Sequence, residues 1–384
     1  MNFEFATATR IVFGAGAISQ LGANVKHFGR RVLAVTGSHP ARAEKMLASL
    51  AASDIAATTF SVTGEPGIAT VENGVALAKK ENCEFVIAFG GGSVVDAGKA
   101  IAAMLKNDGE LLDYLEIIGR GRMLAKRPAP FVAIPTTAGT GAEVTRNAVL
   151  ASPEHKVKVS LRSPLLLARM AVIDPELTYD LPPALTATTG LDALTQLIEP
   201  YVCLRANPLT DGFCLEGISR AARALREAVF NGQNKSARED MALASLFGGL
   251  ALANAGLGAV HGFAGPIGGS FSAPHGAVCA ALLPHVMAAN LRALREREPK
   301  NSALARYEKV AAFLTGNQHA TADAGVEWVQ KLVAELPIPK LSAYGIREEH
   351  VAGIVAKAAN ASSMKANPIA LTLEELAQTL RLAL

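Results

Sequence analysis

The 384-residue chain has few of the residues that mark several large classes of protein. Its four cysteines are widely spaced and form no CxxC pair; they are Cys83, Cys203, Cys214 and Cys279. Neither a disulfide framework nor a thiolate zinc site is therefore predicted, and a reducing cytoplasm is the expected compartment. The first residues lack the basic start and apolar run of a signal peptide, and no uninterrupted apolar run of about 18 residues occurs. We expect neither export nor a membrane anchor.

Charged residues are also scarce, at 18% of the chain, and the formal net charge is only +3. No block of lysine and arginine occurs, and basic residues do not alternate with aromatic ones, so nucleic acid is not an expected partner. Half of the residues are hydrophobic, which is enough to bury a large core. The length predicts about two domains.

The two halves of the chain differ in periodicity. Short β-rich runs alternate with helical stretches in the first half; they cover residues 31–37, 83–92, 130–137 and 169–174. From Leu181 onward these runs stop, and helix caps such as Asn207-Pro208, 236–239 and 372–375 take over. We therefore predict a Rossmann-like α/β domain with a mostly parallel sheet over residues 1–180 and an all-helical domain over 181–384.

Two glycine-rich loops follow predicted strands. GGGSVVDAGKA (90–100) opens a helix, whose free amides and positive dipole suit a pyrophosphate, although a tight turn without a ligand would use the same glycines. PTTAGTGAEVT (135–145) repeats the arrangement with four threonines. Because loops at the carboxyl ends of strands in one sheet face the same crevice, the pair favours a dinucleotide.

Metal-binding residue types occur in the second half. Asp192 and Gln196 lie four residues apart on a predicted helix and share one face. His261 and His275 lie 14 residues apart in a segment rich in glycine and proline, where we expect the backbone to bend around a site. One carboxylate, one amide oxygen and two imidazoles would form a plausible site for Zn²⁺ or Fe²⁺.

These motifs, in this order, resemble the iron-containing (group III) alcohol dehydrogenase family over nearly the whole chain. The matching stretches include TATRIVFGAGA, GGGSVVDAGKA, PTTAGTGAEVT, LTATTGLDALTQLIEPYV, AVHGFAGPIGGSFSAPHGAVCAALLPHV and KANPIALTLEEL. The resemblance implies an N-terminal nucleotide-binding domain, a helical domain and a divalent metal beside the nicotinamide. It assigns the cofactor to Gly91, Gly92, Ser93, Asp96, Thr136, Thr137, Thr140, Thr145 and Lys158. The implied metal ligands are Asp192, Gln196, His261 and His275, of which the two histidines are also the candidate catalytic residues.

The chain departs from the family at two positions. Gln196 stands where the family usually has a histidine ligand, and an amide is a weaker and harder donor, so we expect looser metal binding. Gly265 stands where many members have a further histidine near the substrate. This removes a candidate proton-transfer group and leaves the proton route to ribose hydroxyls and water.

The cofactor preference rests on the end of the strand predicted at residues 31–37. A carboxylate there would repel a 2′-phosphate, but this chain has Gly37 and Ser38. Ser38 and Arg42 offer donors, so we predict that NADP(H) is accepted and preferred. If Gly37 serves only the turn, both NADP(H) and NAD(H) would bind.

The leading functional hypothesis is an NAD(P)-dependent alcohol dehydrogenase or carbonyl reductase that transfers hydride with the help of a metal. The alternatives are a metal-free oxoacid reductase similar to maleylacetate reductases, a lyase similar to dehydroquinate synthases, and a nucleotide-binding protein without catalysis. The resemblance also implies a homodimer that pairs through its N-terminal strands, and we expect it to be cytoplasmic. The TATRIVFG segment is compatible with such an edge strand, although an internal hairpin would have the same pattern.

Overall fold

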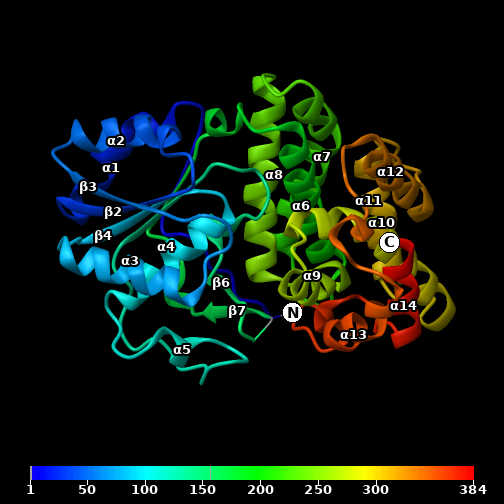
Figure 1. Cartoon of the computed structure of the whole chain (residues 1–384). Coiled ribbons are helices and arrows are strands. Elements are labelled where there is room, and N and C mark those ends of the chain that lie inside the picture. Colours follow the sequence, from blue (N-terminus) through cyan, green and yellow to red (C-terminus); the bar gives the residue numbers. More distant parts are fainter. Residues whose placement is uncertain (1, 156) are drawn as a thin grey trace. The chain divides into compact units, whose positions relative to one another are not determined.

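The computed structural model describes residues 2–155 and 157–384 and divides into two compact units. One unit holds residues 6–137 and 141–178; the other holds 179–384, the short segment 138–140 and the N-terminal residues up to Phe5. Figure 1 shows strands in the first unit and helices in the second. The predicted fold class, a parallel α/β unit and an all-helical unit, is confirmed.

The α/β unit is built on a parallel sheet of six strands in the order β1-β8-β5-β4-β2-β3. Its strands are β1 (Ile11–Phe13), β2 (Arg31–Thr36), β3 (Ala56–Ser61), β4 (Phe85–Gly90), β5 (Phe131–Pro135) and β8 (Met170–Ile173). Four of them match the predicted β-rich runs, whereas β3 was not predicted. An antiparallel hairpin, β6 (Asn147–Ser152) with β7 (Val157–Arg162), was also not predicted.

Helices cover both faces of this sheet (Figure 1). They are α1 (Leu21–Val25), α2 (Glu44–Ala51), α3 (Ile68–Lys80) and α4 (Gly92–Met104), and the short α5 (Leu111–Tyr114) contacts α3. Strand β4 is buried along its whole length, as expected for a parallel strand with helices on both sides. Its residues alternate between the faces: Ile87 packs in the cluster with α1 and α2, whereas Ala88 packs against Gly98 of α4. A Cβ at Gly98 would lie 2.7 Å from that of Ala88, so glycine sets the close approach of α4.

The helical unit contains nine α-helices within its described residues. They are α6 (Pro183–Val202), α7 (Pro208–Phe230), α8 (Lys235–Asn254), α9 (Ala259–Ser270), α10 (His275–Arg297), α11 (Ala303–Thr315), α12 (Ala322–Glu335), α13 (Glu348–Ala359) and α14 (Leu373–Leu382). The predicted caps at Asn207 and Thr372 are confirmed, each with a reciprocal hydrogen-bonded box. The cap predicted at Ser236 is wrong, because Asn234 caps α8 instead.

Helix α6 lies inside the helical unit, where it packs against α7, α8 and α10. The chain bends by 95° between α8 and α9. Our expectation that the segment 259–276 bends around a site is wrong in one respect, since most of it forms the regular helix α9 despite Gly262, Gly265 and Pro266. Gly262 of this helix instead lets a neighbour approach closely, because a Cβ there would lie 2.8 Å from the Met364 side chain.

One helix among the described residues, α10, is long and apolar enough to cross a membrane by length and composition. In the structure, 83% of its most apolar window is buried inside the protein. The bent pair of α8 and α9 passes the same test when its two helices are taken together.

Candidate functional site

One buried face of α6 carries three polar side chains. Asp192, Gln196 and Glu199 follow a spacing of four and three residues, which places them one above the next along the helix. They are 1%, 2% and 4% exposed, respectively. A helix face this polar and this buried requires partners, because an unpaired polar group away from water costs about 1–3 kcal/mol.

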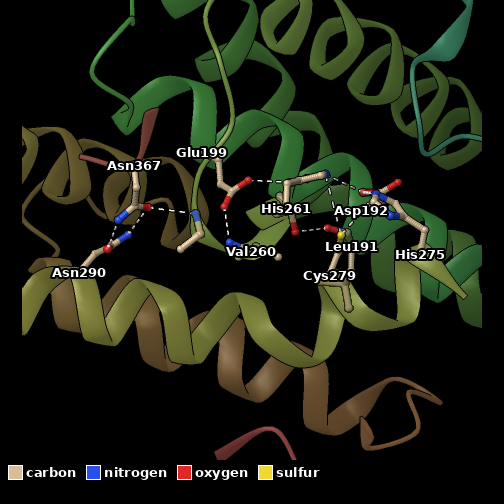
Figure 2. A network of polar contacts seen from close by, with 11 residues as sticks. Leu191, Asp192, Glu199, Val260, His261, His275, Cys279, Asn290 and Asn367 are labelled. Atoms are coloured by element: carbon tan, nitrogen blue, oxygen red, sulfur yellow. Dashed lines mark hydrogen bonds and ion pairs between the residues drawn. The ribbon is translucent and has the colours of Figure 1, made fainter. Parts of the chain in front are cut away.

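Two histidines from other helices face Asp192. His261 Nε2 lies 3.5 Å from Asp192 Oδ1, and His275 Nε2 lies 3.6 Å from the same oxygen. His261 belongs to the first turn of α9 and His275 is the first residue of α10. The structure therefore brings together Asp192 and the two histidines that the sequence separates by 69 and 83 residues. Figure 2 shows these side chains converging from three helices.

Glu199 fixes the orientation of His261. One of its carboxylate oxygens lies 2.6 Å from His261 Nδ1, and the other accepts the backbone amide of Val260 at 2.7 Å (Figure 2). With Nδ1 held as a donor to a carboxylate, Nε2 is the nitrogen that faces Asp192 and is available to a metal ion. Glu199 was not predicted as a site residue, although its seven-residue distance from Asp192 on one helix face indicates that it lies beside the site.

The start of α9 is anchored by two side chains from distant parts of the chain. Asn367 Oδ1 accepts the Ala259 amide at 3.1 Å, next to the Val260 amide held by Glu199. Both acceptors reach these amides because residue 258 is glycine: a Cβ there would lie 2.8 Å from Glu199 Oε1 and 2.9 Å from Asn367 Oδ1. Asn367 is itself bonded to Asn290 of α10 at 2.7 Å. These contacts set where α9 begins and therefore where His261 lies.

The donor atoms of this cluster fit a divalent metal. Asp192 Oδ1 and Gln196 Oε1 are buried and form no hydrogen bond in the described structure. Two ligands of one ion at about 2.0–2.2 Å in tetrahedral geometry lie about 3.4 Å apart, close to the two Asp192–histidine distances. A carboxylate, an amide oxygen and two imidazole nitrogens are the donor set expected of such a site.

The charges in the cluster reinforce one another. Burial alone would raise the pKa of Asp192, but the neighbouring His275 and His261 outweigh burial and hold that pKa below its usual range. Burial likewise opposes the charged form of His261, yet Cys279, Glu199 and Asp192 around it raise the pKa of His261 well above its ordinary value. A cation is therefore favoured at this position, whether it is a proton on an imidazole or a metal ion.

The predicted cofactor residues Gly91, Gly92, Ser93 and Thr136 follow the carboxyl ends of β4 and β5. Gly91 caps α4, which begins at Gly92, so the amides of Gly92 and Ser93 lie in its first turn. Thr136 follows β5, and its amide bonds to the Gly90 carbonyl at 3.0 Å. The strand order reverses between β2 and β4, and ligands of open α/β sheets bind at such reversals.

Gly37 and Ser38 follow β2 on the other side of this reversal. A Cβ at Gly37 would meet only Val94 of α4, at 3.9 Å, so the turn lies beside the first turn of α4. Ser38 Oγ lies 3.1 Å from His39 Nδ1. The guanidinium group of Arg42 donates a hydrogen bond to the Leu177 carbonyl at 2.6 Å. The structure thus brings the β2, β4 and β5 loops to one edge, without a carboxylate at Gly37 or Ser38.

Three predicted cofactor residues have partners within the α/β unit. Asp96 lies 4.0 Å from Lys99 one turn further along α4. Thr145 Oγ1 accepts Lys99 Nζ at 2.8 Å and donates to the Ala142 carbonyl at 3.1 Å. Lys158, on β7, forms an ion pair with Glu65. Lys99 Nζ also donates to the Asn147 carbonyl at 2.9 Å, which ties α4 to the β6–β7 hairpin. Thr140 lies in the segment 138–140, which belongs to the helical unit, whereas Thr137 remains in the α/β unit.

Two family models match nearly the whole chain. Residues 8–175 match the family described as "Iron-containing alcohol dehydrogenase", and residues 186–384 match "Fe-containing alcohol dehydrogenase family, C-terminal". The chain belongs to the iron-containing alcohol dehydrogenase family. Similar proteins include alcohol dehydrogenase 4 of Schizosaccharomyces pombe, 35% identical over 95% of this chain and 85% of the relative. The 1,3-propanediol dehydrogenase of Citrobacter freundii is 35% identical over 99% of this chain and 98% of its own. A crystal structure of 1,3-propanediol oxidoreductase covers 100% of both chains with a TM-score of 0.93 and 34% identity.

As a member of the iron-containing alcohol dehydrogenases, the protein is a nicotinamide-dependent oxidoreductase that acts on CH–OH groups. The family implies a divalent metal as well, and the cluster around Asp192 is a group of residues able to hold one.

Gly265, where the resemblance places a further histidine, is an exposed residue of α9, and a Cβ there would have nothing within 4 Å. The missing imidazole therefore leaves open space rather than a repacked contact.

Sequence patterns missed one further residue of the cluster. Cys279 lies one turn after His275 on α10, and its Sγ is 3.7 Å from His275 Nε2 and 3.9 Å from His261 Nε2. Its donor atom and those of Asp192 and the two histidines all lie within 4.8 Å of one another. Because no CxxC pair occurs, the sequence predicted no cysteine ligand. The four-residue spacing of Cys279 from His275 on one helix face is nevertheless a signal for this contact.

Proposed function

We propose that the chain interconverts a small alcohol and its aldehyde or ketone with NADP(H) as the preferred hydride carrier. We further propose that Asp192, Gln196, His261 and His275 hold a divalent ion, Fe²⁺ or Zn²⁺. The observation that supports this most strongly is the pair of buried oxygens that form no hydrogen bond, Asp192 Oδ1 and Gln196 Oε1, with two imidazole nitrogens 3.5 and 3.6 Å from Asp192 Oδ1. When bound, such an ion polarises the substrate oxygen and lowers the pKa of an alcohol.

Each residue of the proposed site has a separate role. Asp192 supplies the negative charge, and the two histidines supply neutral nitrogen donors. Glu199 holds His261 in the tautomer whose Nε2 is free to coordinate. No side chain has to donate hydride, because the nicotinamide carries it. Without a histidine at 265, the proton of the alcohol leaves through ribose hydroxyls and water.

The proposed NADP(H) preference rests on Gly37 and Ser38 at the end of β2. Neither carries a carboxylate that would repel a 2′-phosphate, and the Ser38 hydroxyl offers a donor. The pyrophosphate is assigned to Gly91, Gly92 and Ser93 at the start of α4, where a helix N-terminus favours negative charge. Comparison of kcat/KM for NADPH and NADH with one aldehyde tests this preference. A higher value for NADH would contradict it.

The metal requirement is tested by elemental analysis of protein purified without a metal-binding tag, followed by NADPH oxidation assays before and after chelation. We expect close to one equivalent of iron or zinc, with activity lost on chelation and restored by added metal. Activity that persists without metal would favour the metal-free oxoacid reductase, and the substrates tested should then be oxoacids.

We also propose that the enzyme is a cytoplasmic homodimer. The three-residue strand β1 lies at the edge of the sheet, where an unpaired strand edge is available to a second copy. Light scattering coupled to size exclusion would give the molar mass, and a monomer at micromolar concentration would contradict the proposal.

A further inference from the structure

We propose that Cys279 is a thiolate ligand of the metal site, so that this chain binds its ion through Asp192, His261, His275 and Cys279, with Gln196 as an accessory oxygen donor. The inference rests on the proposed metal-assisted function and goes beyond it, because it names a sulfur ligand and the metal that sulfur selects. It is carried by the position of the Cys279 sulfur among the other donors (Figure 2).

The distances suit a shared ion. With metal–sulfur and metal–nitrogen bonds of about 2.3 and 2.05 Å, tetrahedral geometry places sulfur and nitrogen about 3.6 Å apart. Cys279 Sγ lies 3.7 Å from His275 Nε2 and 3.9 Å from His261 Nε2. Asp192 Oδ1 lies 3.5 Å from His261 Nε2 and 3.6 Å from His275 Nε2. An ion at the centre of these four atoms would meet each at a normal bond length after shifts of a few tenths of an ångström.

The surroundings also point to a ligand role rather than to packing alone. Cys279 is 0% exposed, and Asp192, at 1% exposed, directs an oxygen without a hydrogen bond into the same cluster. Cys214, the other fully buried cysteine, lies on α7 in the apolar core and belongs to no such group of donors. Asp192 Oδ1 faces the two imidazoles beside Cys279, and without a metal ion its charge would be compensated only by protonation of an imidazole.

A thiolate ligand would compensate for the weak amide donor that Gln196 supplies. An amide oxygen is a weak, hard donor, so a site with Gln196 as its fourth ligand would hold transition metals loosely. A thiolate is a strong, soft donor that favours Zn²⁺ over Fe²⁺ in nitrogen- and carboxylate-rich sites. Burial raises the pKa of the Cys279 thiol to about 12, so coordination requires the metal ion to displace the thiol proton, because the thiolate is the form that binds metal. The expected resident ion is therefore Zn²⁺.

The test uses the full-length protein loaded with Co²⁺, whose spectrum reports thiolate ligation through a near-ultraviolet sulfur-to-cobalt charge-transfer band. Wild type and the matched control C214A should both show this band, and C279A should lack it. In competition with a chromophoric chelator, C279A should bind Zn²⁺ at least about 100-fold more weakly than wild type. Its affinity for Fe²⁺ should fall less, because Fe²⁺ gains less from sulfur.

The outcomes separate this inference from the proposed function. If wild type binds Co²⁺ and needs metal for activity but shows no charge-transfer band, Cys279 is not a ligand and only the present inference fails. If wild type binds no divalent metal and remains active, the metal-assisted function fails as well. If C279A does not fold, the wild-type spectrum alone still decides, since a missing band overturns the proposal. Unchanged Zn²⁺ affinity in folded C279A would also overturn it.

Discussion

His261 Nδ1 lies 2.6 Å from one carboxylate oxygen of Glu199, and the other oxygen of that carboxylate holds the Val260 amide at 2.7 Å. One buried residue of α6 thus sets both the start of α9 and the tautomer of its histidine. The carboxylate selects the imidazole form in which Nδ1 carries the proton and Nε2 has a lone pair available for a metal ion. The metal-binding ability of His261 therefore depends on a residue that does not coordinate the ion.

The substitution Glu199→Gln tests this dependence. A glutamine at 199 can still accept the Val260 amide through its oxygen, but its NH₂ group then faces His261 Nδ1 and favours the tautomer protonated at Nε2. We expect metal affinity to fall about 10–100-fold, while helix content stays close to wild type. Glu335→Gln, on the surface of α12 in an ion pair with Arg226, is the control and should leave affinity unchanged. Equal affinities for E199Q and wild type would show that Glu199 serves only the backbone of α9.

Gln196 offers a test in which metal affinity and stability move in opposite directions. Its Oε1 is buried without a hydrogen bond, and such an atom costs the metal-free protein about 1–3 kcal/mol. Gln196→Met keeps the length of the side chain and removes the oxygen. Chelated Q196M should therefore unfold at higher denaturant concentration than chelated wild type, and it should bind metal more weakly. Gln196→His should instead bind metal at least about tenfold more tightly. A loss of stability in chelated Q196M would mean that the hydrogen bond from the Gln196 NH₂ group to Asp192, which the substitution also removes, outweighs the unpaired oxygen.

The α/β unit contains a buried charged cluster with a distinct pH signature. Burial raises the pKa of Asp96 to about 6 and that of Glu143 to about 7, and it lowers the pKa of Lys99 to about 8. A carboxyl group whose pKa is raised on folding stabilises the protein fully below its unfolded pKa, and this stabilisation is lost as pH rises through the folded pKa. For Glu143 the loss falls between about pH 4.5 and pH 7.

Glu143→Gln removes this titration while keeping the size of the side chain. The free energies of unfolding of E143Q and wild type should be similar near pH 4.5. At pH 8 the variant should be more stable, by an amount on the order of 1–3 kcal/mol. Urea unfolding of both proteins across this pH range, with chelator present throughout, isolates the difference. A constant difference at every pH would show that Glu143 does not titrate in this range.

The sequence predicts those parts of the site that depend on local spacing, and it misses those that depend on packing. The four-residue interval between Asp192 and Gln196 predicts one helix face, and α6 places them so. The glycines after β4 predict a turn into a helix, which α4 confirms. In contrast, the roles of Asn367 and Cys279 arise only when α9 and α10 pack together. No local pattern distinguishes Asn367 from other polar residues, because its partners lie 77 and 108 residues away.

Gly265 provides the last prediction, because it lies one turn after His261 on α9 with open space around its Cα. Gly265→His should fold without rearrangement. It should also be slightly more stable than wild type, by about 0.5 kcal/mol, since glycine is a poorer helix former than histidine. If the imidazole contributes to proton transfer, the pH profile of kcat should gain a new ionisation near the usual histidine range. Gly265→Gln, which has similar bulk and no titration in that range, is the control. A pH profile shared by wild type, G265H and G265Q would show that the proton leaves by a route that does not pass residue 265.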